Sequence, residues 1–432
     1  MLNYLKPIID LEKFIGKPAA EGLRFNPLRL DRTEFERIVP FEIERLPFYK
    51  YGYLLKNAEN AGTHPLHAAG VYYIQEPSAM AAVTALDIKP YSKVLDMCAA
   101  PGSKSTAIAG ELTDGFLVAN EVNAKRAQAL ISNIERMGIS RAMVLNSNAD
   151  DIAKAFEGCF DRVLVDSPCS GEGMFRKHPK VLELWSVENV MACAERSKKI
   201  LNAAAKTVCP GGRLVYSTCT FNTEENEKVI IDFLNSHPDF SLVDTGITGA
   251  DYGLLGLAKA VRIYPSDISE GHFIAALVRR GTKSEFKFKY FKSNTKSSGC
   301  KDIIKHEFKF LGAENKQYIL FDTGTYTLAI PQNIPHPQKL RVLRAGVKLS
   351  EQSYKTALPC HHLFMSNSPD NFSNEIDVDE NLAVNFLKGM PLKTPKGMKG
   401  FAAVKYKSFC IGFGKATDGV LKNHLPRGLF LS

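Results

Sequence analysis

Between residues 76 and 280 the chain alternates short apolar runs with longer helical patterns, and this alternation limits the folds open to it. Each of the first five apolar runs is followed by a segment with helical periodicity. The six runs expected to be strands are KVLDMC, FLVANE, AMVLN, FDRVLVD, GGRLVYSTC and GHFIAALVRR. Apolar strands that are separated by helices predict an α/β fold with a mostly parallel sheet covered on both faces. Ser78 is expected to cap the first helix.

At 432 residues the chain is too long for one hydrophobic core, so several domains are expected. The pattern predicts an N-terminal extension over 1–75, an α/β domain over 76–281, a lysine-rich linker over 282–300 and a β-rich region over 301–432. The net charge of +9 is unevenly placed, because residues 281–432 hold 23 Lys and Arg against 12 Asp and Glu. This excess indicates a region that binds a polyanion, although a solvated lysine-rich surface would give the same count.

Several classes of protein are disfavoured by composition. The chain has no run of about 18 apolar residues, so a membrane span is not expected. The N-terminus lacks the pattern of a signal peptide. The nine cysteines form no C-x-x-C pair, which argues against a disulfide framework or a zinc site and for reduced thiols in the cytoplasm. We therefore expect a cytoplasmic protein without a bound metal, and a monomer.

The first strand ends at Asp96 and is followed by the turn CAAPGSKS, which resembles a ligand-binding loop. The second strand ends at Glu121, about where an acidic residue would bind ribose hydroxyls. The order Gly102-Ser103-Lys104 does not fit a phosphate-binding P-loop, and G-x-G-x-x-G is absent. A purely structural turn is an alternative. S-adenosylmethionine fits best, since acidic residues at three strand ends suit its amine, its ribose and the reacting centre: Asp96, Glu121 and Asp166.

Two cysteines, Cys169 and Cys219, follow predicted strands at the carboxyl edge of the sheet. The other thiols are interpreted as small buried side chains: Cys159, Cys193, Cys209 and Cys410. Asn222 or Thr223 is expected to begin a helix just after Cys219, and a helix N-terminus favours a thiolate.

A methyl donor and a cysteine act together in one reaction, the methylation of C5 of a pyrimidine. C5 is a poor nucleophile until a thiolate adds to C6, and a base must later remove the C5 proton so that the thiolate can leave. A nucleophilic thiol, a carboxylate near the ring and a group for release match the trio Cys219, Asp166 and Cys169. The residues alone give the pair of thiols and not which of them attacks. The target base must also leave any stack to reach them.

The motifs DMCAAPGSKS, VDSPCSGEGMF and GGRLVYSTCTF, in this order, resemble the Fmu/Sun family of RNA cytosine-5 methyltransferases. The segments HPLHAAGVYYIQEPSAM, EGHF and LKNHLPRGL are similar to the bacterial RsmF-like branch, which acts on 16S ribosomal RNA. The resemblance implies a Rossmann-like class I methyltransferase with a seven-stranded sheet, a small N-terminal α/β extension that binds RNA, and a C-terminal PUA-like RNA-binding domain. The implied cofactor is S-adenosylmethionine, and the implied partner is 16S rRNA or the small ribosomal subunit.

The resemblance also assigns roles to residues. It implies that Cys219 is the nucleophile and that Cys169 assists release of the product. The cofactor contacts that it implies are Asp96, Cys98, Ala99, Ala100, Pro101, Gly102, Ser103, Lys104, Glu121, Arg126, Asn148 and Asp166. Asn148 is placed near the adenine, with Asp150 as the alternative. Lys104 is a candidate catalytic residue, although a salt bridge to Asp166 or a capped carbonyl is the favoured interpretation.

Three rival functions are compatible with parts of this sequence. A DNA cytosine-5 methyltransferase would use the Pro-Cys thiol, Cys169, as nucleophile and would need no second one after Thr218. A ribosome-assembly factor without activity would need none of the site residues. A protein methyltransferase would not explain the basic C-terminal third. Within that third, the segment 422–427 is the better candidate for phosphate contact, and 283–296 is expected to be a solvated linker.

Overall fold

A computed structural model describes residues 1–56, 59–282, 288–294, 317–353, 356–366, 372 and 374–431. Its centre is a ten-stranded mixed sheet in the order β11-β12-β13-β9-β8-β5-β6-β7-β16, with β10 also paired to β13. The neighbours β7, β6, β5, β8 and β9 are parallel, as the apolar runs predicted. The strands from the α/β region are β5 (Lys93–Asp96), β6 (Phe116–Asn120), β7 (Ala142–Leu145), β8 (Phe160–Asp166), β9 (Val208–Thr218), β10 (Phe240–Val243), β11 (Asp251–Tyr252), β12 (Val261–Ile263) and β13 (His272–Arg279).

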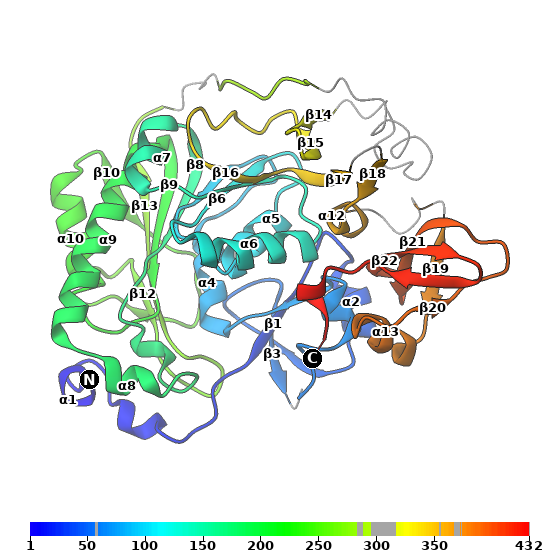
Figure 1. The fold of residues 1–432 in the computed structure, drawn as a ribbon. Helices are drawn as coiled ribbons and strands as arrows, with labels where there is room; N and C mark the ends of the chain where they lie inside the picture. The colour runs from blue at the N-terminus through cyan, green and yellow to red at the C-terminus, as the bar shows by residue number, and fades with distance from the viewer. Residues whose placement is uncertain are drawn as a thin grey trace.

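Helices cover both faces of this sheet (Figure 1). Along β5, Val94 packs into the core beneath α4, α5 and α6, and Leu95 packs into the core beneath α7, α9 and α10. Burial on both faces explains why these strands read as continuous apolar runs. The helices are α4 (Pro77–Ala85), α5 (Ser103–Gly110), α6 (Ala124–Arg136), α7 (Ala149–Ala155), α8 (Lys180–Leu184), α9 (Val187–Thr207) and α10 (Glu227–Ser236), with the 3-10 turn η2 (Glu172–Met174). The predicted α/β fold is confirmed.

The N-terminal part forms a separate antiparallel sheet in the order β2-β3-β1-β4. Its elements are α1 (Leu2–Leu5), η1 (Leu11–Phe14), β1 (Gly22–Phe25), α2 (Arg32–Ile38), β2 (Glu42–Arg45), β3 (Gly52–Lys56), α3 (Pro65–Ala68) and β4 (Tyr72–Ile74). The C-terminus of the chain lies beside this sheet (Figure 1). The two parts share a hydrophobic core, in which Tyr53 and Tyr72 cluster with Phe386 and Tyr406.

The C-terminal part is rich in strands, as predicted, and holds two further sheets in the orders β14-β15-β17-β18 and β19-β21-β22-β23-β20. Its elements are β14 (Tyr318–Asp322), β15 (Tyr326–Pro331), β16 (Val342–Ala345), β17 (Val347–Ser353), β18 (Thr356–Pro359), α12 (His361–Met365), β19 (Glu375–Val378), α13 (Glu380–Leu387), β20 (Leu392–Lys393), β21 (Gly400–Tyr406), β22 (Phe409–Thr417), β23 (Val420–Asn423) and η5 (Arg427–Leu429). Much of the predicted linker, 283–287 and 295–300, lies outside the described residues.

Strand β16 departs from the other C-terminal strands, because it pairs antiparallel with β7 and extends the central sheet. Gly346 follows it with φ of +59° and donates its N–H to the carbonyl of Ala142 at 2.9 Å. A side chain at this glycine would meet the carbonyl oxygen of Ala329, so the tight turn between β16 and β17 requires glycine. The C-terminal region therefore adds a strand to the sheet that carries the predicted site.

Two local predictions were wrong. Helix α4 begins one residue before Ser78, and its cap is Glu76, whose carboxylate accepts from the N–H groups of Ser78 and Ala79. Helix α10 begins at Glu227 and not at Asn222, because the Asn222 side chain closes a separate turn by accepting from the N–H of Glu225. At α4 a carboxylate two residues before the predicted cap starts the helix earlier, and at α10 the predicted cap closes a turn that precedes the helix.

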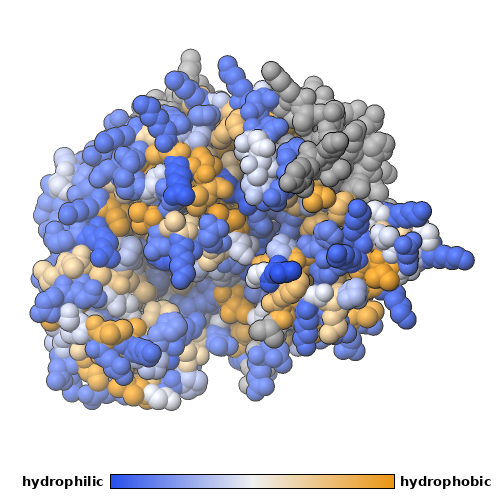
Figure 2. Space-filling model, viewed as in Figure 1, coloured by the Kyte–Doolittle hydropathy of each residue, from blue (hydrophilic) through white to orange (hydrophobic). Residues whose placement is uncertain are grey.

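Hydrophilic side chains dominate the face of the molecule shown in Figure 2, with apolar patches between them. In the part of the chain that the structure describes, no helix is long and apolar enough to cross a membrane.

Candidate active site

The carboxyl ends of β5, β6, β8 and β9 meet at one edge of the sheet and bring the predicted residues together. Asp96 and Asp166 are the last residues of β5 and β8. Glu121 and Cys219 directly follow β6 and β9. Because these parallel strands are in register, with Asp166 opposite Ser217, the side chains that follow them share one edge.

Asp166 and Lys104 form a partly buried ion pair at this edge. The Lys104 Nζ donates to Asp166 Oδ2 at 2.8 Å, and the Ser217 hydroxyl donates to Oδ1 at 2.8 Å. Burial alone would raise the pKa of Asp166, but the Lys104 ammonium and His272 hold it well below its usual range. Burial alone would lower the pKa of Lys104, but Asp166 raises it. Both groups are therefore charged at neutral pH, and the expected salt bridge of Lys104 is present.

The two cysteines at this edge face one another. The Sγ atoms of Cys169 and Cys219 lie 3.4 Å apart, within hydrogen-bond distance for sulfur. The hydrogen bond to Cys219, together with burial, raises the pKa of Cys169 well above its usual value. Cys169 is thus a neutral thiol that can donate to the sulfur of Cys219. Cys159, Cys193, Cys209 and Cys410 are buried, as interpreted from the sequence.

Two buried carboxylates that the sequence analysis did not single out hold the cysteine loops in place. Glu225 accepts from the N–H of Ser170 at 2.9 Å and from the Asn222 amide at 2.7 Å. Glu172 accepts from the N–H groups of Phe221 and Asn222 at 2.7 and 2.9 Å. Glu225, which follows Cys219, thus bonds the loop of Cys169, and Glu172, which follows Cys169, bonds the loop of Cys219.

The indole of Trp185 also donates to Glu172 at 2.9 Å, and the Gly173 N–H donates to the carbonyl of Cys219 at 2.9 Å. The bonds of Glu172 and Glu225 clamp the two cysteine loops together. The signal for this clamp in the sequence was an acidic residue inside each cysteine motif, SGEGMF and NTEEN.

A third residue missed by the sequence analysis is His272, at the start of β13. Its Nε2 lies 3.6 Å from Asp166 Oδ1, which is too long for a good hydrogen bond. The ring is buried, and neither nitrogen has a hydrogen-bond partner among the described residues. The imidazole therefore faces the Asp166 carboxylate with unused hydrogen-bonding capacity. Its only signal in the sequence was its place in the EGHF segment.

The loop from Cys98 to Lys104 joins β5 to α5 and is pinned by helix α6. Gly102 caps α5 with φ of +109°, and a side chain there would crowd Leu130. Arg126 donates to the carbonyl of Ala100 at 2.7 Å, and Asn133 donates to that of Pro101 at 2.9 Å. The backbone of this loop is therefore held close to the sheet edge.

Glu121 and Arg126 lie side by side at the neighbouring strand end. Glu121 is buried and accepts from the N–H of Asn123 at 2.8 Å. The Arg126 guanidinium lies 3.4 Å from its Oε2. This arrangement leaves a carboxylate beside the loop, where ribose hydroxyls would be bound.

The bonding of the Asp96 carboxylate shows whether the site fits a cationic amine. One of its oxygens accepts from the Ser105 hydroxyl at 2.6 Å, and the other is buried without a partner among the described residues. Burial, together with the charge of Asp166, raises the pKa of Asp96 to about 7. An unpaired buried carboxylate oxygen is costly, and the amine of S-adenosylmethionine would supply its missing partner. The residues at this edge therefore fit the cofactor.

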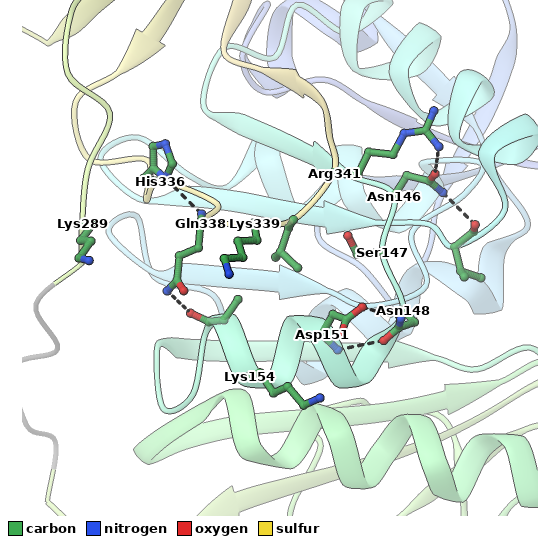
Figure 3. Close-up of a pocket in the computed structure, with 13 residues that line it drawn as sticks. Asn146, Ser147, Asn148, Asp151, Lys154, Lys289, His336, Gln338, Lys339 and Arg341 are labelled. Carbon is green, nitrogen blue, oxygen red and sulfur yellow. Dashed lines mark hydrogen bonds between the residues drawn. The ribbon is translucent and has the colours of Figure 1, made fainter.

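Asn148 lies apart from the ion pair and the cysteines. It caps α7 by accepting from the N–H of Asp151 at 2.9 Å, and its amide donates to Asp151 Oδ2 at 2.6 Å. With Val122 it lines the cavity drawn in Figure 3. Asp150 is exposed on the same helix. Among the described residues, no group of His, Cys, Asp or Glu is arranged to hold a metal ion.

The doubly covered sheet, the glycine-containing loop after its first strand and the acidic strand ends define a Rossmann-like, S-adenosylmethionine-dependent methyltransferase. Sequence models of three families match consecutive parts of the chain. They are described as the N-terminal domain of 16S rRNA methyltransferase RsmF over residues 4–77, 16S rRNA methyltransferase RsmB/F over 83–278, and the methyltransferase RsmF PUA domain over 373–431.

Curated relatives match over nearly the whole length. Ribosomal RNA small subunit methyltransferase F of Vibrio cholerae is 31% identical, across 99% of this chain and 96% of that protein. The protein of the same name from Serratia proteamaculans is 29% identical, across 98% and 93%. The chain therefore belongs to the RsmB/F family of 16S rRNA methyltransferases, and the predicted family, cofactor and PUA domain are confirmed.

Solved structures agree with the fold. A methyltransferase homologue from Pyrococcus horikoshii is 28% identical with a TM-score of 0.56, covering 62% of this chain and 89% of that one. NSun6 from the same organism is 20% identical with a TM-score of 0.57, covering 65% and 97%, and shows the fold alone.

Proposed function

We propose that this chain methylates C5 of cytosine in 16S rRNA through a covalent bond between Cys219 and C6 of the base. The observation that carries the proposal is the pair of thiols 3.4 Å apart, at the sheet edge that also holds the Asp166–Lys104 ion pair. A methyltransferase that modified an amine or a hydroxyl would not need a second thiol against the first.

In the first step the Cys219 thiolate adds to C6, and the electron pair of the C5–C6 double bond becomes available at C5. The Cys169 thiol stabilises the attacking thiolate by donating to it. Asp166 stays ionised and accepts from the exocyclic amine of cytosine, while Lys104 keeps that carboxylate in place. When bound, S-adenosylmethionine supplies the methyl group that C5 takes.

In the second step the C5 proton leaves, its electron pair restores the C5–C6 double bond, and the C6–sulfur bond breaks. Cys169 gives its proton to the departing Cys219 sulfur, and the resulting Cys169 thiolate takes the proton from C5. Both cysteines end as thiols, and Cys219 then releases a proton to water in place of the one taken from C5, so its starting thiolate is restored and protons and electrons balance. The raised pKa of Cys169 suits this role, because the side chain starts as a thiol.

The other predictions from the sequence complete the proposal. Residues 1–75 and 301–432 would hold the rRNA around the domain over 76–281, with 282–300 as the linker. Asn148 would contact the adenine. We place the reaction in the cytoplasm, where thiols stay reduced, and the enzyme acts as a monomer.

The decisive experiment is a denaturing gel of the Cys169→Ala protein purified from cells, with and without ribonuclease. We expect a slowly migrating, ribonuclease-sensitive species that disappears in the Cys169→Ala/Cys219→Ala double variant. Cys193→Ala, which removes a buried thiol on α9, is the matched control and should run clean. An adduct on Cys219→Ala instead of Cys169→Ala would reverse the two roles, as in a DNA-type enzyme. No adduct on any variant would contradict the covalent mechanism.

A further inference from the structure

A cavity of about 940 Å³ opens between α7 and the 332–341 loop that leads into β16. It lies beside the edge of the sheet that carries the cofactor residues, which we call the cofactor edge. Its lining comes from three parts of the chain that are far apart in sequence (Figure 3). The lining residues are Val122, Asn146, Ser147, Asn148, Asp151, Lys154, Ala155, Lys289, His336, Gln338, Lys339, Leu340 and Arg341.

Positive charge converges on this cavity. Lys154 comes from α7, Lys289 from the segment after β13, and Lys339 and Arg341 from the 332–341 loop. None of the three lysines forms an ion pair with another residue that the structure describes. The one acidic lining residue, Asp151, is already bonded to the Asn148 amide at 2.6 Å. Four cations therefore face a space with one engaged carboxylate.

The wall that carries these charges is fixed by hydrogen bonds and is not a loose surface. Gln338 donates its amide to the carbonyl of Ala155 at 2.8 Å, and the Asn146 N–H donates to the carbonyl of Arg341 at 3.0 Å. The His336 N–H donates to the carbonyl of Lys289 at 2.6 Å. The 332–341 loop is thus tied to the end of α7, to β7 and to the segment after β13.

The His336 ring adds a fifth donor. Its Nδ1 accepts from the N–H of Gln338 at 3.1 Å, so the neutral ring carries its proton on Nε2. That Nε2–H has no partner among the described residues, and His336 is exposed.

The cofactor does not account for this charge. S-adenosylmethionine carries a sulfonium and an amine against one carboxylate, so it is itself a cation and would be repelled by four more. A phosphate backbone has the opposite charge and matches lysines that have no carboxylate partner. Apart from the His336 ring, the lining has no aromatic side chain on which unstacked bases could stack.

We propose that this cavity binds the phosphate backbone of the RNA substrate, next to the nucleoside end of the cofactor, through Lys154, Lys289, Lys339 and Arg341. The inference rests on the proposed function, because it assigns this surface to the same RNA. Contacts to phosphates position a strand without reading its sequence. The C-terminal third therefore holds RNA against the catalytic sheet itself as well as through its PUA domain.

The test compares the full-length wild type with the Lys154→Gln/Lys289→Gln/Lys339→Gln variant, using a protein-free 16S rRNA transcript at several KCl concentrations. We expect the plot of log affinity against log salt to become less steep by roughly 2, since each phosphate contact on a single strand contributes about 0.7. The affinity at moderate salt should fall on the order of tenfold, and an unrelated single-stranded RNA should lose as much. Affinity for S-adenosylmethionine and the thermal unfolding temperature should stay at wild-type values.

Two control variants make the result specific. Replacing the same lysines by arginine keeps the charge and should restore the salt slope. Neutralising three exposed lysines of the domain over 76–281 that do not line the cavity, Lys199, Lys206 and Lys259, should leave the slope near that of the wild type.

An unchanged slope in the cavity variant, or an equal change in the control, would overturn the inference. So would a loss of binding to small ribosomal subunits but not to protein-free rRNA, which would indicate a protein partner. Failure of the Cys169→Ala protein to accumulate the Cys219 adduct would instead count against the proposed function, because salt-dependent RNA binding is measured without catalysis.

Discussion

The sheet edge that carries Cys169 and Cys219 (the cysteine edge) and the basic cavity lie on the same sheet. They differ in how their charged groups are paired. At the cysteine edge the charged groups are bonded to neighbouring side chains, as in the pairing of Asp166 with Lys104 and of Glu172 with Trp185, and one oxygen of Asp96 is the exception. Around the cavity the lysines are exposed and have no ionic partner among the described residues. The first region is preorganised to act on a few atoms, and the second is suited to long-range attraction of a polyanion. Their responses to mutation, pH and salt should therefore differ.

The largest effect is expected at the buried ion pair. Asp166→Asn should lower the rate of methylation by roughly 10³-fold, because it removes the carboxylate beside the reacting ring. It should also lower the free energy of unfolding by about 3–5 kcal/mol, since Lys104 would be left buried without its partner. Single-turnover methylation and urea denaturation measure the two effects. Asp232→Asn, on the exposed face of α10, is the control and should change neither by much.

Salt separates this variant from the cavity variant. The Asp166→Asn defect should persist in 0.5 M KCl, because a buried pair is poorly screened. A defect that high salt removes would mean that Asp166 acts at long range, and the contrast between the two regions would fail.

The cysteine edge was predictable because it depends on local pattern. Strand ends follow from apolar runs, and parallel strands carry the residues after them to one edge, so Asp96, Glu121 and Asp166 were placed correctly. The backbone groups that Glu172 binds, those of Phe221 and Asn222, lie about fifty residues away, and no local pattern identifies them. Ser78 was misjudged as a cap for a local reason, since Glu76, two residues earlier, caps the helix and starts it at Pro77.

The cavity was beyond prediction because it depends on a pairing between distant strands. Arg341 reaches Asn146 across 195 residues only when β16 joins β7. In the sequence, the apolar run of residues 339–349 indicates a strand but not its neighbour. The charge count pointed to the C-terminal third, and not to the junction of that third with α7.

A smaller effect is expected for the clamp between the cysteine loops. Glu172→Gln should lower the free energy of unfolding by about 2 kcal/mol, because the new amide cannot accept all the bonds that the carboxylate accepted. Trp185 is the only tryptophan in the chain and donates to Glu172, so its fluorescence should change in the folded variant. Thermal unfolding and emission spectra test this. Glu183→Gln, exposed on α8, should leave both unchanged, and a silent Glu172→Gln would show that the clamp is not needed.

Cofactor binding should depend on pH through Asp96. A cationic amine needs the ionised carboxylate, and a pKa of about 7 leaves much of it protonated in the free protein. Affinity for S-adenosylmethionine should therefore rise about eightfold between pH 6 and pH 7.5. The stability of the ligand-free protein should fall as the pH rises from about 4 to 7, because the folded state binds this proton more tightly than the unfolded chain. Titration calorimetry at several pH values is the measurement, and a flat profile, or an equal profile in Asp96→Asn, would contradict it.

The smallest effect would show whether the two regions communicate. The Arg341 guanidinium donates to the Asn146 amide oxygen at 3.0 Å, and the Asn146 amide donates to the carbonyls of Glu121 and Val122 at 2.8 Å. Arg341→Lys keeps the charge but loses the bond to Asn146. RNA affinity should stay within about twofold, because the phosphate contact is electrostatic. Cofactor affinity should fall by up to about fivefold, the worth of one hydrogen bond of about 1 kcal/mol, since the carbonyls beside the ribose site are less firmly held. Equal losses for both ligands would mean that the cavity and the cofactor edge act as one site. A loss for RNA alone would mean that Arg341 serves RNA binding and does not support the cofactor site.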